Sequence, residues 1–225
     1  MIIAIDGPSG AGKSTVAKAV AKKLGFSCLD TGAMYRAIAW QALKEGVDLE
    51  DDAALGVIAR EKDIEFGHVD GDPVPKRVFI DGTEVTDAIR TAEIDKAVSP
   101  VSAAPSVRKA LVAQQQRIGC AGNYVVEGRD IGTVVFPDAE VKVFLTASDE
   151  ERAHRRVRQN VDRGIGSIDY EEVLVDLQRR DDHDSKRATS PLRPAEDAVH
   201  LDSTDTYIED VIERICAMAR ECMNR

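Results

Sequence analysis

The sequence predicts an α/β fold built around a parallel β-sheet. Two observations carry this prediction. Short apolar runs alternate along the chain with segments whose apolar residues recur every three or four positions, and a glycine-rich turn joins the first run to the first such segment. The 225 residues, of which 43% are hydrophobic, suffice for one domain with a sizeable core, and no repeat or flexible linker divides them.

The predicted core elements follow one another as strands and helices. In the first helix Val16, Val20 and Leu24 share one face, and Gly25 supplies a C-terminal stop. Buried strands are expected at residues 2–5, 26–29, 124–126, 141–145 and 198–201. Helices are expected at residues 14–24, 33–45, 51–60, 91–99 and 106–118.

A stretch of different character, residues 64–89, lies between these elements. Asp81-Gly82 separates two runs rich in β-forming residues, which is typical of a hairpin turn, so we expect a small antiparallel insert. Three further helices are predicted by a capping residue followed three positions later by glutamate. The pairs are Ser148 with Glu151, Asp169 with Glu172, and Thr206 with Glu209.

The turn after the first strand matches a phosphate-binding pattern. Residues 7–14 read GPSGAGKS and fit GxxxxGK[ST] between a predicted strand and a predicted helix. Glycines let successive backbone N–H groups point at phosphate oxygens at a helix N-terminus, where the partial charge is positive. Lys13 is expected to reach the β- and γ-phosphates of a nucleotide, and the Ser14 hydroxyl to ligate Mg²⁺.

The composition argues against several other classes of protein. With 30 Lys and Arg against 40 Asp and Glu the net charge is −10, so nucleic acid is not an expected partner. No apolar run approaches the roughly 18 residues of a membrane helix, and the first residues are typical of a strand and not of a signal peptide. Four scattered cysteines indicate neither a zinc site nor a disulfide framework, and we expect them in a reducing cytoplasm.

The phosphate-binding turn alone leaves three functions open. A GTPase switch needs an Asn-Lys-x-Asp motif, which the sequence lacks. An ATPase motor needs an acidic residue at the end of an apolar strand, and Glu127 or Asp130 could serve, although the chain is short for coupling machinery. A small-molecule kinase needs a second site for its acceptor.

Three charged segments predict a second anion site. They are residues 29–36, 127–133 and 179–187. The first two follow predicted strands, and the carboxyl ends of parallel strands meet at one edge of a sheet, where ligands bind. Arg36, Arg129 and Arg187 are therefore expected to converge on an anion other than the triphosphate. Residues 152–163 contain five arginines, and we expect them to lack the acidic partners that a salt-bridged helix surface would have. This segment is therefore predicted to contact anions as well.

Four segments together resemble a known family. GPSGAGKST, LDTGAMYR, GRDIGTVVFPDA and RRDDHDSKRATSPL, in this order and spacing, are similar to the bacterial cytidylate kinases over nearly the whole chain. The resemblance implies a single domain with a P-loop NTPase-type three-layer α/β fold, a five-stranded parallel sheet, an antiparallel NMP-binding insert and an Arg-rich lid. The insert would lie at about residues 61–90 and the lid at about 148–163, with the core at 1–60, 91–147 and 164–225.

The resemblance also implies a role for each matching residue. ATP would be bound by Gly7, Pro8, Ser9, Gly10, Ala11, Gly12, Lys13, Ser14 and Thr15. The acceptor nucleotide would be bound by Thr31, Arg36, Ser99, Arg108, Arg129, Asp130, Arg180, Asp184 and Arg187. Catalysis would involve Lys13, Arg129, Arg152, Arg155, Arg156 and Arg163. Within the acceptor set the resemblance places Arg36, Arg129 and Arg187 on the phosphate, Arg180 and Asp184 on the ribose, and Ser99, Arg108 and Asp130 on the base.

The implied activity is transfer of the γ-phosphoryl group of ATP to CMP and dCMP with Mg²⁺, in a cytoplasmic monomer without a nucleic-acid or membrane partner. Asp130 gives the choice of base a physical reason, since a carboxylate accepts from the 4-amino group of cytosine and repels the carbonyl oxygen of uracil. Two positions depart from the family pattern, because Glu127 stands where many relatives carry aspartate and Pro100 directly follows Ser99.

Overall fold

The computed structural model describes residues 1–224, which form two compact units. The first unit consists of Met1–Leu29 and the chain from Gly122 onward, and the second of Asp30–Ala121. The first unit is built on the parallel sheet, and the second contains the antiparallel strands. Within the described range no helix is long and apolar enough to cross a membrane.

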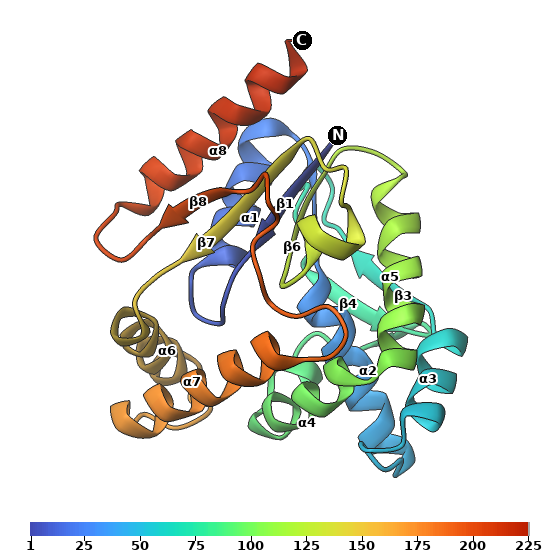
Figure 1. The fold of residues 1–225 in the computed structure, drawn as a ribbon. Coiled ribbons are helices and arrows are strands. Elements are labelled where there is room, and N and C mark those ends of the chain that lie inside the picture. The colour runs from blue at the N-terminus through green and yellow to red at the C-terminus, as the bar shows by residue number, and fades with distance from the viewer. Residues whose placement is uncertain (225) are drawn as a thin grey trace. The chain divides into compact units, whose positions relative to one another are not determined.

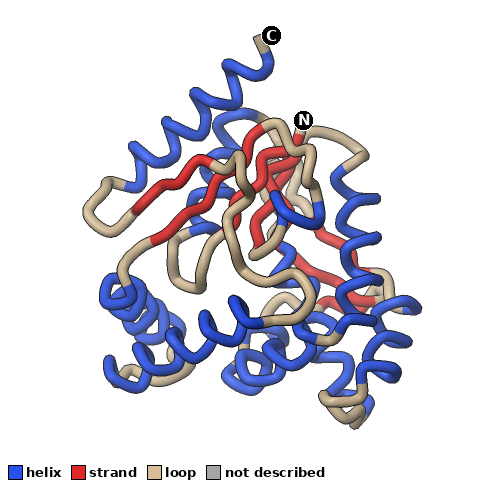
Figure 2. Tube along the Cα trace, viewed as in Figure 1, coloured by secondary structure: helices blue, strands red, loops and turns tan. Residues whose placement is uncertain are grey.

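The first unit is built on a five-stranded parallel sheet (Figures 1 and 2). Its strands are β1 Ile2–Asp6, β2 Ser27–Asp30, β6 Tyr124–Gly128, β7 Val141–Thr146 and β8 Val199–Asp202. In the order β2-β6-β1-β7-β8, the central β1 runs parallel to β6 and β7, with Ile3 opposite Val125 and Val141. Ile3, Ala4 and Ile5 are fully buried, which explains the continuous apolar run that predicts this strand. All five predicted strands are confirmed.

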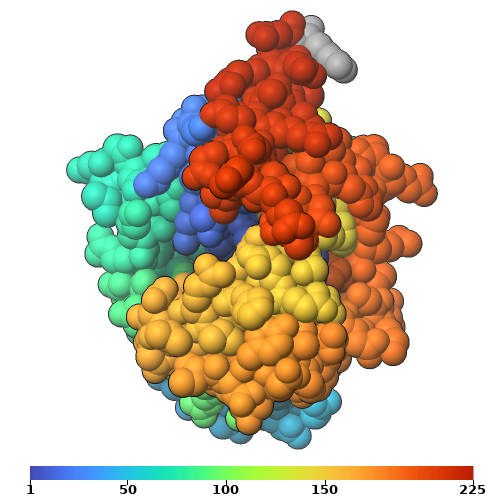
Figure 3. Space-filling view, turned by 90° about the vertical axis from the view of Figure 1, so that its left-hand side faces the viewer, coloured from blue at the N-terminus to red at the C-terminus, as the bar shows by residue number. Residues whose placement is uncertain are grey.

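Four helices of the first unit form two packed pairs. They are α1 Lys13–Leu24, α6 Asp149–Arg163, α7 Tyr170–Lys186 and α8 Ile208–Met223. Helices α1 and α8 contact each other and strands of the sheet. Helices α6 and α7 pack through Ala153, Val173 and Leu177, and Figure 3 shows their residues, yellow to orange, next to each other on the surface. The arginine-rich segment is therefore a helix with its own apolar contact to α7.

Two of the three predicted helix caps are confirmed. Oγ of Ser148 and Oδ1 of Asp169 accept hydrogen bonds from the backbone N–H three residues later, at 3.2 and 3.0 Å. The third prediction was wrong by one residue, because α8 has Tyr207 at its N-cap and no side-chain cap within the described chain. The Thr206 hydroxyl donates instead to the carbonyl oxygen of Asp202 at 3.0 Å, a local bond that competes with capping.

The second unit combines helices with a three-stranded antiparallel sheet. Its elements are α2 Thr31–Glu45, α3 Asp52–Glu61, β3 Ile64–Gly67, β4 Arg77–Ile80, β5 Thr83–Glu84, the 3₁₀ turn η1 Ala88–Arg90, α4 Ala92–Ala103 and α5 Pro105–Gly119. Strand β4 lies between β3 and β5. Asp81 and Gly82 join β4 to β5 with φ angles of 45° and 71°, the positive values that a tight two-residue hairpin requires. The predicted hairpin is confirmed.

Helix α4 is longer than the sequence predicts. The helix was expected to end at residue 99, but it continues through Pro100 to Ala103. Proline lacks a backbone N–H, yet its carbonyl can still accept, and the Pro100 oxygen receives a bond from Ala104 N at 3.2 Å. Ser99 consequently lies inside a helix, where its carbonyl oxygen accepts from the Ser102 hydroxyl at 3.0 Å.

Candidate active site

The chain leaves β1 through a turn that only glycine can begin. Gly7 has a φ of 149°, and a Cβ on it would lie 2.0 Å from the carbonyl oxygen of Leu145 in β7. Gly12, with a φ of 92°, is the N-cap of α1, where no side chain of the described residues caps the helix and no acidic residue occupies the first turn. The N-terminus of α1 therefore keeps the positive end of the helix dipole, which suits an anion.

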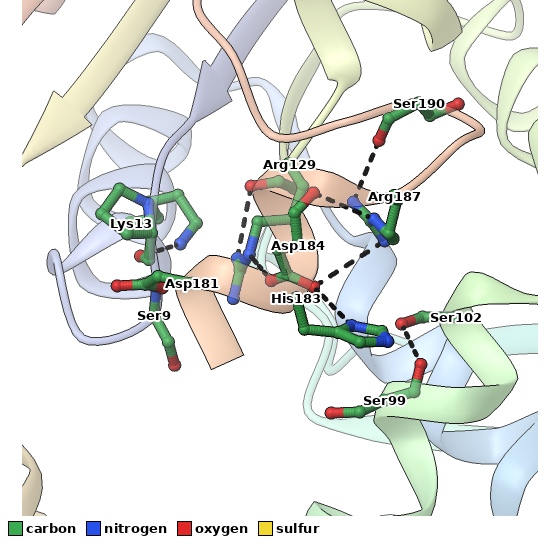
Figure 4. A network of polar contacts seen from close by, with 12 residues as sticks. Ser9, Lys13, Ser99, Ser102, Arg129, Asp181, His183, Asp184, Arg187 and Ser190 are labelled. Atoms are coloured by element: carbon green, nitrogen blue, oxygen red, sulfur yellow. Dashed lines mark hydrogen bonds and ion pairs between the residues drawn. The ribbon is translucent and has the colours of Figure 1, made fainter. Parts of the chain in front are cut away.

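Lys13, the first residue of α1, folds back over this turn. The residue is only 6% exposed, and Nζ donates a hydrogen bond to the carbonyl oxygen of Pro8 at 2.7 Å (Figure 4). Burial of the ammonium group and the positive charge of Arg129 lower the pKa of Lys13 to about 7, although Glu127 and Asp6 oppose this shift. A phosphate group brought to Lys13 would favour its charged form.

Two arginines of α6 are directed to the same turn. Nη2 of Arg156 donates to Oγ of Ser9 at 3.0 Å. Arg155 donates twice to Ser203, which follows β8, from Nη1 to the hydroxyl at 3.0 Å and from Nη2 to the carbonyl oxygen at 2.6 Å. The Ser203 hydroxyl in turn donates to the carbonyl oxygen of Ala11 at 3.2 Å. Arg156 of the predicted catalytic set thus bonds to the phosphate-binding turn directly, and Arg155 is joined to it through Ser203.

Arg152 holds the same turn from inside the protein. The residue is 3% exposed, and its guanidinium group donates to the carbonyl oxygens of Ala147 at 3.2 Å and Ser9 at 2.9 Å. It also forms ion pairs with Asp149 and Asp181. With these four partners, the guanidinium group of Arg152 supports the loop and joins it to α7.

The expectation that the α6 arginines lack acidic partners was wrong. Asp149 pairs with Arg152 three residues later, and Glu151 pairs with Arg155 four residues later at 2.8 Å. Both acids lie in the first turn, so they complement the helix dipole as well as the arginines. Arg163 is exposed at the C-terminal end of α6. At a rise of 1.5 Å per residue it lies roughly 16 Å along the helix from Arg152, away from the contacts that Arg152, Arg155 and Arg156 make.

Asp184 in α7 gathers two of the predicted phosphate-binding arginines. Nε of Arg129 donates to Oδ2 at 3.0 Å, and Nη1 of Arg187 lies 3.9 Å from Oδ1 (Figure 4). Arg187 also donates from Nη2 to the carbonyl oxygen of Ser190 at 3.1 Å. Burial acts to raise the pKa of Asp184, but the positive charges of Arg129, Arg187 and Arg180 outweigh it and lower the pKa below its ordinary value. The first unit thus contains guanidinium groups assembled around one buried carboxylate.

Three buried carboxylates lie at and just beyond the carboxyl ends of β1 and β6. Asp6, Glu127 and Asp130 are each 4% exposed. Burial raises the pKa of Asp6 to about 6, even though the N–H groups of Ile131 and Gly132 donate to its two carboxylate oxygens. Ile131 and Gly132 directly follow Asp130, the predicted contact to the base. Hydrogen bonds to Asp6 therefore hold the backbone immediately after Asp130.

The second unit contains the predicted acceptor residue Arg36. Its Nη1 donates to the carbonyl oxygen of Ile89 at 3.1 Å, and its Nη2 forms an ion pair with Asp95 of α4. Thr31, another predicted acceptor residue, is buried and opens α2, which the Asp30 side chain caps. A carboxylate thus orients Arg36 in the second unit, as one orients Arg129 in the first.

Arg108, a predicted base contact, is buried within the second unit. It is 2% exposed, and Nη1 donates to the carbonyl oxygen of Ser102 at 3.2 Å. Its guanidinium carbon lies 5.4 Å from the centre of the Tyr35 ring, a distance that suits a cation–π contact. Because Ser102 also bonds to Ser99, the two predicted base contacts of this unit share one neighbour.

Mg²⁺ fits the oxygen donors that the first unit offers. No group of three or more His, Cys, Asp or Glu between residues 1 and 224 could hold a metal ion by itself. Nucleotide-bound Mg²⁺ needs few protein ligands, because phosphate oxygens and water fill most of its octahedron. Ser14 has its side chain exposed in the first turn of α1, next to Lys13, and its hydroxyl is a donor of the required kind.

Some residues at the site escaped prediction from the sequence. Asp181 lies in a charged segment that was singled out, but its pairing with Arg152 joins residues 29 positions apart. Asp6 directly precedes the predicted phosphate-binding turn and Asp95 lies inside a predicted helix, but no spacing rule assigns a partner to either residue. The sequence did hold a signal for Asp6, because burying an acidic side chain at the end of an apolar strand is costly unless hydrogen bonds or a charged partner offset the cost, so a partner is expected.

Comparison with known proteins identifies the relatives of this chain. Residues 3–221 match the family model described as "Cytidylate kinase". The cytidylate kinase of Rhodococcus opacus is 50% identical over 225 residues, covering 98% of this chain and 95% of that protein. The cytidylate kinase of Bacillus subtilis is 50% identical over 214 residues, covering 95% and 93%. A solved structure of an uncharacterised protein from Eubacterium ventriosum, 10% identical, matches 100% of this chain and 99% of its own with a TM-score of 0.54, which indicates a shared fold.

Proposed function

The chain belongs to the cytidylate kinase family, and from this premise we propose how its residues divide the work of a nucleoside monophosphate kinase. The reaction is ATP-dependent phosphorylation of CMP. The observation that carries the proposal is the convergence of Lys13, Arg155 and Arg156 on one glycine-rich turn at an uncapped helix N-terminus. Such a convergence of positive groups suits the charge that develops during phosphoryl transfer.

On the donor side, the phosphates of ATP bind residues 7–15. Lys13 exchanges the Pro8 carbonyl for the β- and γ-phosphates, and Arg155 and Arg156 offset the charge on the transferring group. Arg152 belongs to the same catalytic set, and its buried contacts support a role in holding the loop. The role of Arg163 stays a prediction from the sequence.

On the acceptor side, the first unit supplies phosphate and sugar contacts. Arg129 and Arg187 hold the phosphate of CMP, because guanidinium groups match phosphate oxygens with two parallel hydrogen bonds. Arg180 and Asp184 bind the ribose, and Asp130 accepts from the 4-amino group of cytosine. The support is that Asp184 already orients Arg129 and Arg187.

The second unit contributes further contacts to CMP. Arg36 binds the phosphate, Ser99 and Arg108 contact the base, and Thr31 belongs to the same set of acceptor-binding residues. The support is chemical, since Arg36 and Arg108 are held in place by hydrogen bonds to carbonyl oxygens of their own unit. These assignments rest on the family motifs.

The chemistry asks little covalent help of the protein. A phosphate oxygen of CMP attacks the γ-phosphorus, the bond from that phosphorus to the bridging oxygen of ADP breaks, and CDP and ADP result. No general base is required, because a phosphate monoester with a second pKa of about 6 is already mostly dianionic at neutral pH. Positioning and charge neutralisation therefore provide most of the catalysis. Ser14 would hold Mg²⁺ together with the nucleotide phosphates, and the ion would supply positive charge at those phosphates.

The proposal also covers a second acceptor, the cellular compartment, the oligomeric state and the partners of the protein. The protein accepts dCMP as well as CMP, and works as a cytoplasmic monomer with no nucleic-acid or membrane partner. The net charge of −10 supports the absence of a nucleic-acid partner, and four free cysteines support a reducing compartment.

An acceptor panel tests the proposed choice of substrate. ADP production is measured in a coupled assay with ATP, Mg²⁺ and, in turn, CMP, dCMP, UMP, AMP and GMP. CMP should give the highest kcat/KM, with dCMP next. A higher kcat/KM for AMP or GMP would overturn the proposed recognition of the base.

Asp130→Ala tests which residue reads the base. Because a buried polar group left unpaired costs about 1–3 kcal/mol, the preference for CMP over UMP in kcat/KM should fall roughly ten- to hundredfold. Asp138→Ala is a matched control, since Asp138 is an exposed aspartate eight residues further along. An unchanged preference in the Asp130 variant would place base recognition elsewhere.

A further inference from the structure

Asp6 has hydrogen-bonding partners that its place in the sequence does not suggest. It ends the central strand β1, immediately before the phosphate-binding turn, and is 4% exposed. Its Oδ1 accepts from the N–H of Ile131 and its Oδ2 from the N–H of Gly132, both at 2.7 Å. These N–H groups open a short π-helical turn, Ile131–Val135, that begins directly after Asp130.

The carboxylate of Asp6 and the π-helical turn fix two successive peptide groups at both ends. In the first group, the Asp130 carbonyl oxygen accepts from Val134 N at 2.9 Å while the Ile131 N–H is bound to Asp6. In the second, the Ile131 carbonyl oxygen accepts from Phe136 N at 2.7 Å while the next N–H is bound to Asp6. Neither peptide plane can rotate without breaking a hydrogen bond in a buried place.

The peptide group that joins Asp130 to Ile131 is therefore held by a residue from outside its own segment. Asp130 has φ −144° and ψ 26°, which is neither an extended nor a helical conformation. The direction of the Asp130 side chain depends on the peptide planes on both sides of it, and the contact with Asp6 fixes the plane on its C-terminal side. Asp6 is itself well anchored, because it lies opposite Gly128 of β6 and Phe144 of β7 in the sheet.

We infer that Asp6 is a positioning residue for base recognition: by clamping the N–H groups of Ile131 and Gly132, it aims the Asp130 carboxylate at the cytosine amino group. This inference rests on the proposed role of Asp130 as the residue that reads the base. A carboxylate suits the task better than an amide, since it offers acceptors to both N–H groups, whereas asparagine places an NH₂ donor against one of them. Charge-assisted bonds to backbone N–H groups are also among the stronger ones.

The first experiment measures substrate selectivity in Asp6→Asn. The preference for CMP over UMP in kcat/KM should fall roughly tenfold, because one of the two clamping bonds is lost and Asp130 is no longer aimed. KM for CMP should rise more than KM for ATP. Asp197→Asn is the matched control. Both carboxylate oxygens of Asp197 also accept hydrogen bonds, at 3.0 and 2.7 Å, but the donor is Nζ of Lys142 and the Asp197 side chain is exposed. Equal losses for CMP, UMP and ATP would mean that Asp6 serves the phosphate-binding turn, and would overturn the inference.

A double-mutant cycle separates positioning from a general structural role. If Asp6 acts through Asp130, then Asp6→Asn should leave the already reduced CMP:UMP preference of the Asp130→Ala variant unchanged within about twofold. A further tenfold loss in that background would show that Asp6 acts on the base by another route. If Asp130→Ala alone leaves the preference at the wild-type value, the proposed reader of the base is wrong; that result is distinct from failure of the clamp.

Two further measurements cover a variant that does not fold. Asp6→Glu keeps both acceptor oxygens but displaces them by one methylene, and should lower the CMP:UMP preference severalfold with KM for ATP within about twofold. In the wild-type protein, the amide protons of Ile131 and Gly132 should exchange with solvent at least a hundredfold more slowly than in an unfolded peptide. Unprotected exchange at these two amides, or an Asp6→Glu variant with wild-type selectivity, would overturn the inference.

Discussion

The phosphate-binding turn and the cluster around Asp184 are two regions for anions that are built in opposite ways. The turn uses contiguous residues, mainly backbone N–H groups at the start of α1, with Lys13 held by a neutral carbonyl oxygen. The Asp184 cluster uses side chains from separate elements, and a buried carboxylate holds its arginines. The first region is defined by backbone shape and the second by balanced charge.

This difference predicts different weaknesses. A backbone site tolerates most side-chain changes but fails where the backbone path or its one essential cation is altered. A charge-balanced site is more sensitive to removal of its counter-ion, because a buried charge without a partner is costly. Four substitutions, two in the turn and two in arginine–carboxylate pairs, test this contrast.

The largest effect is expected for Lys13→Ala. Removing the cation from the β- and γ-phosphates should lower kcat roughly ten-thousandfold, while CMP binding, which uses other residues, stays measurable by calorimetry. Lys18→Ala, five residues further along α1, should keep wild-type turnover. Turnover within tenfold of wild type in the Lys13 variant would contradict the role of the turn.

A second substitution tests the backbone path with no loss of charge. Gly7→Ala should destabilise the protein by about 4 kcal/mol, because the new Cβ would lie 2.0 Å from the Leu145 carbonyl oxygen and the strands would have to shift. Gly25→Ala also places alanine at positive φ, 68°, but with nothing within 4 Å, and should cost about 1 kcal/mol. Urea unfolding measures both. Equal losses would mean that φ alone, and not the contact with β7, decides the cost.

Sequence patterns predicted the backbone-defined parts of this molecule well. The five strands, the hairpin at Asp81-Gly82 and the phosphate-binding turn each depend on residues adjacent in the chain. The longer course of α4 past Pro100 and the displaced cap of α8 were missed, since each is decided by one local hydrogen bond that competes with the usual rule.

For the charge-balanced parts, the sequence predicted which residues belong to the site but not which of them pair with one another. The sequence singled out Arg129 and Asp184, yet nothing in it says that they bond across 55 positions. Asp95, as the partner of Arg36, carried no pattern at all, because the pair spans 59 positions and two helices. Pairing of this kind is a property of tertiary packing, which local spacing does not encode.

The third substitution removes a buried counter-ion. Asp184→Asn should destabilise the protein by about 3 kcal/mol at neutral pH, because Arg129 and Arg187 lose the carboxylate that balances them, and should raise KM for CMP more than KM for ATP. The pKa of Asp184 is lowered in the folded state, so its contribution is full above the ordinary aspartate range and is lost as pH falls below about 4. Urea unfolding at pH 7 and at pH 3 should therefore show a gap between variant and wild type that narrows in acid. A gap that widens in acid would contradict the sign of the shift.

The smallest effect is expected for Asp95→Asn in the second unit. This carboxylate is about one-third exposed, with a side-chain accessibility of 37%, so solvent screens its pairing with Arg36 and the loss should stay under about 1 kcal/mol. Arg36 also keeps its bond to the Ile89 carbonyl oxygen at 3.1 Å, so KM for CMP should change by less than about threefold. Asp63→Asn, which alters a more exposed pair with Arg117, is the control and should leave both quantities unchanged. If Asp95→Asn were as damaging as Asp184→Asn, burial would not be what distinguishes the two carboxylates, and orientation of the arginine would be the quantity that matters in both.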